Sequence, residues 1–304
     1  MKRKQFLQAS SFTLAALTLA EYKSFSYFFA DPWKIKMLRN DIGIFTERGG
    51  TIGFMLSKKG IVVVDSQFPD QAKHLIDELT IRQLKKGNDK PFKLLINTHH
   101  HGDHTGGNIQ FKNLVPHVVG HENCLLNHKR LAEQQKSTDK QLFADTTFKD
   151  TWKTKIGREK IKAHYFGPAH TNGDAIIHFQ HANIAHMGDL VFNRRYAFID
   201  RTAGASVKGW ISVLDKTLAT FDNETLFIFG HAFDPEKVTG NKEDLKAMQN
   251  YLARMLQFVE SEIKSGKSKE EILKATSIPG VAEWKGDGIQ RGLTAVYEEL
   301  TAAK

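Results

Sequence analysis

Residues 97–108 read NTHHHGDHTGGN, and the rest of the chain is organised around this stretch. It places four histidines and one aspartate beside three glycines. The preceding run FKLLI, residues 92–96, predicts a short buried strand, so the histidine cluster lies where a strand ends and the chain turns. Because neutral imidazole and carboxylate groups suit zinc and related divalent ions, the stretch predicts a metal site.

The alternation of side chains along an extended segment divides this cluster into parts. Alternate residues point the same way, so His99 and His101 can face one ion while the histidine between them faces elsewhere. Gly102 then lets the chain turn and present Asp103 and His104 to a second position. The stretch therefore holds candidate ligands for two neighbouring metal positions.

The spacing H-x-H-x-D-H within this stretch resembles the signature of the metallo-β-lactamase superfamily of hydrolases. The resemblance implies three further ligands in order: a histidine, an aspartate after a strand and a glycine, and a late histidine. The candidates are His170 in the sequence GPAHTNGD, Asp189 in HMGDL and His231 in FGH. Each lies next to an apolar run that predicts a strand, so all the candidate ligands belong to strand-end loops.

The same resemblance implies a pair of metal ions, which we expect to be zinc. Such a pair lowers the pKa of bound water toward ~7 and stabilises the developing oxyanion, so the implied activity is hydrolysis by a metal-bridging hydroxide. Asp103 is then a candidate catalytic residue as well as a ligand. The implied ligand sets are His99, His101 and His170 for one ion and Asp103, His104 and His231 for the other, with Asp189 and the hydroxide bridging them.

Other functions remain open at this point. A mononuclear iron enzyme of the persulfide dioxygenase type shares the implied fold and part of the ligand set. A β-lactamase proper of the subclass with a cysteine ligand fits poorly, because Asp189 occupies the nearest strand-end position; glyoxalase II-like thioesterases match better. A non-enzymatic periplasmic metal-binding module would not need Asp103 and His104 to complete a second site. The expected substrate is an ester, thioester, lactone or lactam.

Length and composition indicate one globular domain, which we place at residues 31–304. A chain of 304 residues with 40% hydrophobic content can bury a large core. The single cysteine, Cys124, excludes an intramolecular disulfide, and we expect it to be a small buried residue in a helix that begins near His121.

Residues 1–20 have the three regions of a signal peptide: a basic start, an apolar run and small residues before a cleavage point. The sequence RKQFL at residues 3–7 resembles a twin-arginine export motif with lysine in place of the second arginine. The apolar run is too short to span a bilayer. We therefore expect an exported protein, located in the periplasm, without a stable membrane span.

The charge of the chain favours a small anionic substrate. Removing residues 1–20, which carry three basic residues and no acid, would lower the formal charge from +9 to +6. The basic residues that remain form no long tract and do not alternate with aromatic residues, so the sequence does not require a nucleic-acid partner. A net positive charge raises the local concentration of anions, and we expect the substrate to be one.

Apolar periodicity, together with the resemblance, predicts a four-layer αββα sandwich with C-terminal helices. The turns RGG at residues 48–50 and KKG at 58–60 separate the first strands. The C-terminal helices can pack on the sandwich or form a homodimer contact. The expected strands are 42–45, 51–56, 61–65, 92–96, 175–179, 184–187 and 225–229; the expected helices are 69–86, most of 121–150, 243–264, one from 268 and 288–302, with 134–140 as an exposed insert.

Two residue groups outside the ligand sets are candidates for supporting roles. Asp65 ends an apolar strand, and the resemblance implies that it supports the metal loop by hydrogen bonding; capping a turn is the alternative. Arg194 and Arg195 follow Asp189 closely, and a planar guanidinium can bind a substrate anion through two hydrogen bonds. The alternative is that these arginines pair with Asp200 and neighbouring acids and fix their loop.

Overall fold

The computed structural model describes residues 33–84 and 91–302. The expected signal peptide at residues 1–20, and the last two residues of the helix predicted at 69–86, lie outside these residues, so both stay predictions. Residues from Ile35 onward form one compact unit. Within the described part of the chain, no helix combines the length and the apolar character that crossing a bilayer requires.

The first sheet contains seven strands of the described chain, hydrogen-bonded in chain order. The pairs β2–β3 and β3–β4 are antiparallel, and the pairs from β4 to β7 are parallel. The parallel pairs place the ends of β4 and β5 at the same edge, where the histidine-rich stretch follows. The strands are β1 (Lys34–Met37), β2 (Ile42–Thr46), β3 (Ile52–Ser57), β4 (Gly60–Val64), β5 (Phe92–Ile96), β6 (Val118–His121) and β7 (Thr146–Phe148).

The second sheet has six strands among the described residues, in the order β15-β13-β11-β10-β9-β8. A separate two-stranded parallel sheet is formed by β12, which follows β11 in the chain, and β14, which follows β13. The strands are β8 (Thr151–Ile156), β9 (Glu159–His164), β10 (Ile176–Phe179), β11 (Ile184–His186), β12 (Phe192–Asn193), β13 (Leu226–Ile228), β14 (His231–Ala232) and β15 (Thr239–Gly240).

The two sheets pack face to face through an apolar layer that follows the alternation of each strand. In β10, Ile177 and Phe179 belong to the core between the sheets, while Ile176 belongs to a second core under the C-terminal helices. Val62 and Val64 of β4 contribute to the core between the sheets from the opposite side. Burial of both sheet faces explains why these strands read as nearly continuous apolar runs.

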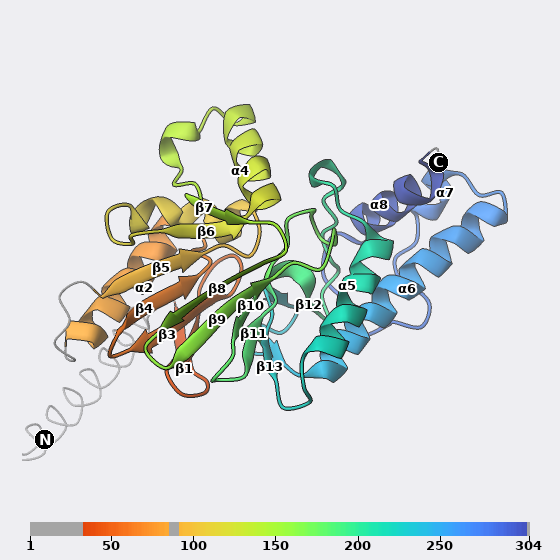
Figure 1. Cartoon of the computed structure of the whole chain (residues 1–304). Coiled ribbons are helices and arrows are strands. Elements are labelled where there is room, and N and C mark those ends of the chain that lie inside the picture. The colour runs from red at the N-terminus through yellow and green to blue at the C-terminus, as the bar shows by residue number, and fades with distance from the viewer. Residues whose placement is uncertain (1–32, 85–90, 303–304) are drawn as a thin grey trace, which may run out of the picture. The chain divides into compact units, whose positions relative to one another are not determined.

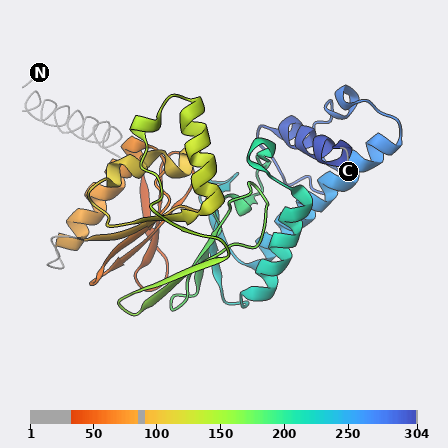
Figure 2. The same cartoon turned by 45° about the horizontal axis from the view of Figure 1, so that its top comes forward.

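Helices form the two outer layers (Figure 1), and the view in Figure 2 agrees. Helices α2 (Pro69–Leu84) and α4 (Glu122–Gln134) lie on the side of the first sheet. Helices α5 (Val207–Thr220), α6 (Lys242–Lys264) and α8 (Ile289–Thr301) lie on the side of the second, with the short α7 (Lys269–Ile272) near α8. The architecture is the predicted αββα sandwich with C-terminal helices.

Most predicted elements are confirmed, including the capping box at Ser268 that begins α7. The prediction that 121–150 is mostly helical is wrong after Gln134, because residues 146–148 form β7 and pair with β6. Two threonines in this strand are β-branched, which favours extended backbone over helix. The hairpin of β8 and β9 and the helix α5 were not predicted.

Candidate metal centre

The seven predicted ligands come from four segments that follow strands and meet at one edge of the two sheets. Their neighbours in the chain are short helical turns, α3 (Gly102–Thr105) and η3 (Gly188–Leu190), and the strand β14. Gly102, expected to allow the turn, is the first residue of α3 and does not adopt a positive φ. The residues brought together are His99, His101, His170 and Asp189 in one group and Asp103, His104 and His231 in a second.

In the first group, three imidazole nitrogens converge on one point. His101 Nδ1 lies 3.1 Å from His99 Nε2 and 2.9 Å from His170 Nε2. Asp189 Oδ2 lies 3.8 Å from His99 Nε2 and 3.5 Å from His170 Nε2. These separations are close to the roughly 3.3 Å between two nitrogens bound to one tetrahedral ion at ~2.0–2.1 Å.

Hydrogen bonds on the outer side of each ring fix which nitrogen carries the proton. His101 Nε2 lies 2.9 Å from Asp200 Oδ2, and His170 Nδ1 lies 2.8 Å from the Phe198 carbonyl oxygen. Carboxylate and carbonyl oxygens only accept hydrogen bonds, so these outer nitrogens donate. Burial lowers the pKa of His170 to about 4, so its ring is neutral. The converging nitrogens therefore present lone pairs to one another, which fits a bound cation.

The second group lies beside the first and shares the carboxylate of Asp189. His231 Nε2 is 3.0 Å from Asp103 Oδ2 and 3.5 Å from Asp189 Oδ2. His104 Nε2 is 3.0 Å from Asp189 Oδ1 and 3.7 Å from Asp103 Oδ2. His104 Nε2 and Asp189 Oδ1 are nevertheless buried atoms that make no hydrogen bond within the described chain. Orphaned buried polar atoms are costly, and a metal ion between them would satisfy both.

The carboxylates of Asp103 and Asp189 give this cluster a negative charge that attracts cations. Burial lowers the pKa of His104 and His231, but the charges of the neighbouring carboxylates, that of Asp189 foremost, and the hydrogen bonds to them together outweigh it. They raise the pKa of His231 to about 9 and that of His104 well above its ordinary value. Burial raises the pKa of Asp103, but the charge of His104 and the hydrogen bond and charge of His231 together outweigh it and hold that pKa at about 2. The cluster therefore requires positive charge, which either protons or metal ions can supply.

Asp65 holds a histidine of the second group and the start of the metal loop by hydrogen bonds. Its carboxylate accepts hydrogen bonds from Thr98 N at 2.8 Å, Thr98 Oγ1 at 2.7 Å and His104 Nδ1 at 2.8 Å. The residue is fully buried and has a positive φ of 64°. Such a conformation is uncommon outside glycine, asparagine and aspartate and often occurs at functional sites. Asp65 thus orients the ring of His104 and ties the strand β4 to the metal loop.

Asp200 likewise orients a histidine of the first group, a role that the local sequence did not predict. The alternative that the arginines pair with Asp200 is wrong for this residue: Oδ2 accepts from His101, while Oδ1 accepts from Thr202 Oγ1 and Ala203 N. Asp200 and His101 are 99 positions apart. His100 faces away from the four-residue group, as expected, and its Nε2 lies 3.8 Å from Asp200.

We expect Asp200→Asn to weaken metal binding about 10–100-fold while the fold is retained, as for other residues that orient metal ligands. The amide can still accept from Ala203 N through one oxygen, but its NH₂ group then faces His101 Nε2. This favours the tautomer with the proton on Nδ1, the nitrogen that points at the other ligands. Chelator competition with the zinc-loaded protein measures the affinity, and circular dichroism checks the fold. An unchanged zinc affinity would contradict the role.

The tip of the β2–β3 hairpin lies against the metal loop. Gly50 N donates to the Asp103 carbonyl oxygen at 3.1 Å, and a Cβ on Gly50 would lie 2.2 Å from His104 Cε1. On the far side, Thr51 N donates to the Gly230 carbonyl oxygen at 2.9 Å. The hairpin therefore joins the two sheets at the edge that carries the ligands.

The arginines after Asp189 differ in their surroundings. The Arg194 guanidinium lies over the Trp284 ring at 4.9 Å and 3.8 Å from Asp244 Oδ1. Arg201 contacts Glu299 at 3.4 Å and the Ala205 carbonyl oxygen. These two side chains are held by the C-terminal helices. Arg195 is exposed and, within residues 33–84 and 91–302, forms no ion pair.

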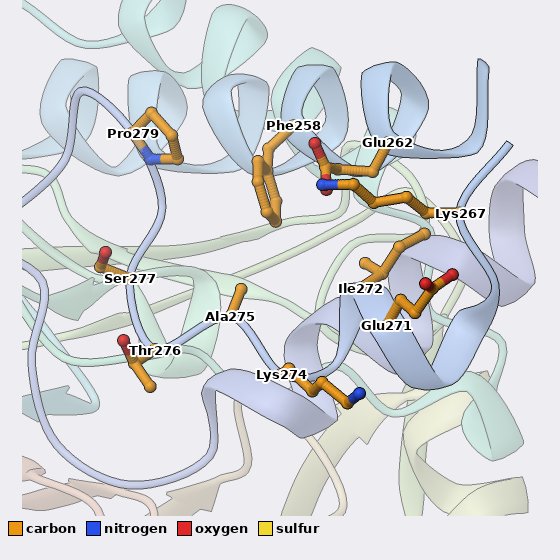
Figure 3. Close-up of a pocket in the computed structure, with 10 residues that line it drawn as sticks. All are labelled: Phe258, Glu262, Lys267, Glu271, Ile272, Lys274, Ala275, Thr276, Ser277 and Pro279. Carbon is orange, nitrogen blue, oxygen red and sulfur yellow. The ribbon is translucent and has the colours of Figure 1, made fainter. Parts of the chain in front are cut away.

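Hollows elsewhere on the molecule contain none of the seven ligands. One of about 430 Å³ lies between the end of α6, α7 and the segment up to Pro279 (Figure 3), and its charged side chains Glu262 and Lys267 pair with each other. Another of about 760 Å³, lined by Met55, Ile156 and other residues, lies where β3 ends and β9 begins. Both hollows therefore lie apart from the strand-end cluster.

Comparison with known proteins agrees with this site. The profile of the Metallo-beta-lactamase superfamily matches residues 45–231. A metallo-beta-lactamase type 2 from Elizabethkingia meningoseptica is 22% identical over 207 residues, 65% of this chain and 78% of the relative. A "Probable hydroxyacylglutathione hydrolase" from Schizosaccharomyces pombe is 26% identical over 198 residues, 62% of this chain and 69% of the relative.

Solved structures share the fold. A metallo-beta-lactamase from Pontibacter korlensis superimposes with a TM-score of 0.58 at 20% identity, covering 73% of this chain and 99% of that one. A double mutant of a sec-alkyl sulfatase superimposes with a TM-score of 0.67 at 12% identity, covering 88% of this chain and 50% of that one. The matched profile includes all seven converging residues and extends over more than half of the sequence, so the chain belongs to the metallo-beta-lactamase superfamily.

Proposed function

We propose that this protein is a dinuclear zinc hydrolase that cleaves an ester, thioester, lactone or lactam bearing an anionic group. One observation carries the proposal: the Asp189 carboxylate lies between histidines of both groups. Oδ2 lies 3.5 Å from His170 Nε2 in the first group and 3.5 Å from His231 Nε2 in the second, and Oδ1 lies 3.0 Å from His104 Nε2. A single carboxylate between two donor groups is suited to bridging two ions.

The donor chemistry supports zinc in both positions. Three neutral imidazoles with a carboxylate, and two imidazoles with two carboxylates, are nitrogen and oxygen sets that zinc binds well. When bound, two such ions would acidify water toward neutral pH and polarise the carbonyl group of a substrate. The hydrogen bonds from the outer ring nitrogens to Asp65 and Asp200 would keep the histidines oriented for this.

Asp103 is the residue of this chain that we propose acts directly in the reaction. Its side chain is 28% exposed, whereas those of Asp189 and His104 are almost completely buried. It is therefore the acidic group of the cluster that substrate can approach. The low pKa of about 2, held there against burial by His104 and His231 together, keeps the carboxylate ionised at neutral pH. An ionised Asp103 can hold a metal ion and accept a hydrogen bond from the attacking water.

Asp189 also bears on the substrate class. A carboxylate at this position favours the thioesterase-like members of the superfamily over β-lactamases with a cysteine ligand. We therefore place thioesters and related esters before lactams among the substrates to be tested.

Metal analysis and two ligand variants test the proposal together. We expect about two zinc ions per chain in the purified protein. Asp103→Asn and His104→Ala should keep the fold but remove most turnover on a panel of thioester, lactone, lactam and ester substrates, because each loses a ligand of the second group. One iron and no zinc would point to the dioxygenase type instead. Unchanged turnover in both variants would remove the second metal ion from the mechanism.

A further inference from the structure

Two exposed aromatic side chains lie next to residues of the metal-ligand cluster, one in space and the other along the chain. Phe198 is 40% exposed and Phe233 is 50% exposed, and no other Phe, Tyr or Trp of the described residues falls in the exposed class. The Phe198 ring lies 5.4 Å from the His101 ring and 6.0 Å from the His170 ring. Phe233 follows His231 by two residues in the chain. Exposed apolar rings beside a polar site are typical of ligand-binding surfaces.

A segment from the C-terminal part of the chain lies beside both rings. It begins at Trp284, which is buried and stacks on Tyr251 with ring centroids 4.9 Å apart. Lys285 N donates to the Arg194 carbonyl oxygen at 3.0 Å, and Tyr196 N donates to the Lys285 carbonyl oxygen at 3.0 Å. These contacts fix the segment against the loop that follows Asp189, although it lies beyond the part of the sequence that the family profile matches.

Each exposed ring has an exposed arginine next to it. A Cβ on Gly286 would lie 3.8 Å from both Arg195 Cγ and Phe233 Cδ2, so these two side chains border the same glycine. The Arg291 guanidinium lies over the Phe198 ring at 5.9 Å. The surface around the cluster thus alternates phenyl rings with guanidinium groups.

Both arginines remain available to a ligand. Unlike Arg194, neither Arg195 nor Arg291 forms an ion pair with any residue in the described part of the chain. Asp234 and Asp287 are exposed on the neighbouring segments, but the structure pairs neither with these guanidinium groups. A planar guanidinium binds carboxylate, sulfate or phosphate groups through paired hydrogen bonds.

We propose that the segment 284–291 completes the substrate site and that the site selects an amphipathic anion. The apolar part of the ligand lies on Phe198 and Phe233, and its anionic group binds Arg195 and Arg291. This inference rests on the proposed hydrolase function for the identity of the reacting bond. It adds that the C-terminal part of the chain, outside the matched family profile, contributes to substrate selection.

Calorimetric titration of the zinc-loaded protein tests the inference without any turnover. The probes are 1-octanesulfonate, whose sulfonate is a weak zinc ligand, and 1-octanol as its neutral analogue. The double variant Arg195→Ala/Arg291→Ala should lower the affinity for octanesulfonate about tenfold or more and leave that for octanol unchanged, because charge-assisted hydrogen bonds are lost. Phe198→Ser and Phe233→Ser should weaken both probes. Arg158→Ala, an exposed arginine in the β8–β9 turn, is the matched control and should change neither.

Equal octanesulfonate affinity in the wild type and the double arginine variant would overturn the inference, as would tighter binding of octanol than of octanesulfonate to the wild type. Phe198→Leu, which keeps an apolar side chain, should lose less affinity than Phe198→Ser; an equal loss would speak against the apolar contact. Because the titration measures binding alone, a protein that hydrolyses no tested ester can still support the inference. Conversely, a protein that hydrolyses thioesters but binds both octyl probes equally would retain the proposed function and lose this inference.

Discussion

Replacing Gly230 with alanine is expected to lower kcat/KM about 100-fold or more and to reduce the zinc content of the purified protein. A Cβ at this position would lie 2.0 Å from Asp189 Oδ1 and 2.8 Å from the carbonyl carbon and oxygen of Gly188. The backbone atoms of Gly188 cannot move freely, because Gly230 N donates to the same carbonyl oxygen at 2.8 Å. The alanine therefore displaces the shared carboxylate, and misplacing a catalytic group by ~1 Å can cost about 100-fold.

Gly102→Ala is the matched control for this variant. Gly102 lies inside the histidine-rich stretch, yet a Cβ there would meet no atom within 4 Å. It is also the first residue of α3, where alanine is a better helix former than glycine. We expect zinc content and activity close to those of the wild type. Atomic absorption and steady-state kinetics on the same preparations measure both quantities. Full zinc occupancy and full activity in Gly230→Ala would show that the site tolerates displacement of the Asp189 carboxylate.

The comparison of these glycines shows where the sequence was informative and where it was not. The H-x-H-x-D-H stretch was recognised as a local pattern after an apolar strand, and the family resemblance then pointed to His170, Asp189 and His231 beside other strands. Gly102 looked important for the same local reason, but the chain turns there with an ordinary φ. Gly50 and Gly230 owe their importance to side chains far away in the sequence, His104 and Asp189, which only the folded chain brings within reach.

The same limit explains the predictions that failed. Asp200 reads as one acid in a basic loop, and nothing near it in the sequence indicates that its partner is His101. The polar composition of 121–150 suggested helix throughout. Residues 146–148 instead form an edge strand, because their backbone pairs with β6. The four-layer αββα sandwich was predicted mainly through the family resemblance. Tertiary pairing decided each of these cases, and local propensity could not reveal it.

Asp65→Ala is the second variant for which we expect a large effect, in this case on stability. Three donors, namely Thr98 N, Thr98 Oγ1 and His104 Nδ1, would lose their acceptor in a fully buried position. Each unsatisfied buried donor costs about 1–3 kcal/mol, and relaxation will recover part of this. Alanine at a φ of 64° adds roughly 1 kcal/mol of backbone strain. We therefore expect the free energy of unfolding to fall by about 3–5 kcal/mol.

Urea unfolding in the presence of a chelator measures this loss, because removing metal separates the stability of the fold from that of the site. Asp65→Asn is the control: asparagine tolerates positive φ and keeps one accepting oxygen for Thr98 N, so its loss should be clearly smaller. A fall of less than ~1 kcal/mol in Asp65→Ala would mean that water replaces the carboxylate at little cost.

The Asp65→Asn variant also tests whether Asp65 and Asp200 each act on a different metal position. Asp65 accepts from His104 Nδ1, as Asp200 accepts from His101 Nε2, so each fixes the tautomer of a histidine in a different group. An amide in place of Asp65 turns an NH₂ group toward His104 Nδ1 and moves the ring proton to Nε2, the nitrogen that faces Asp189. Asp65→Asn should therefore bind one zinc ion nearly as well as the wild type and the second about 10–100-fold more weakly. Asp200→Asn should do the reverse, and loss of both ions together in either variant would mean that the two groups do not bind metal independently.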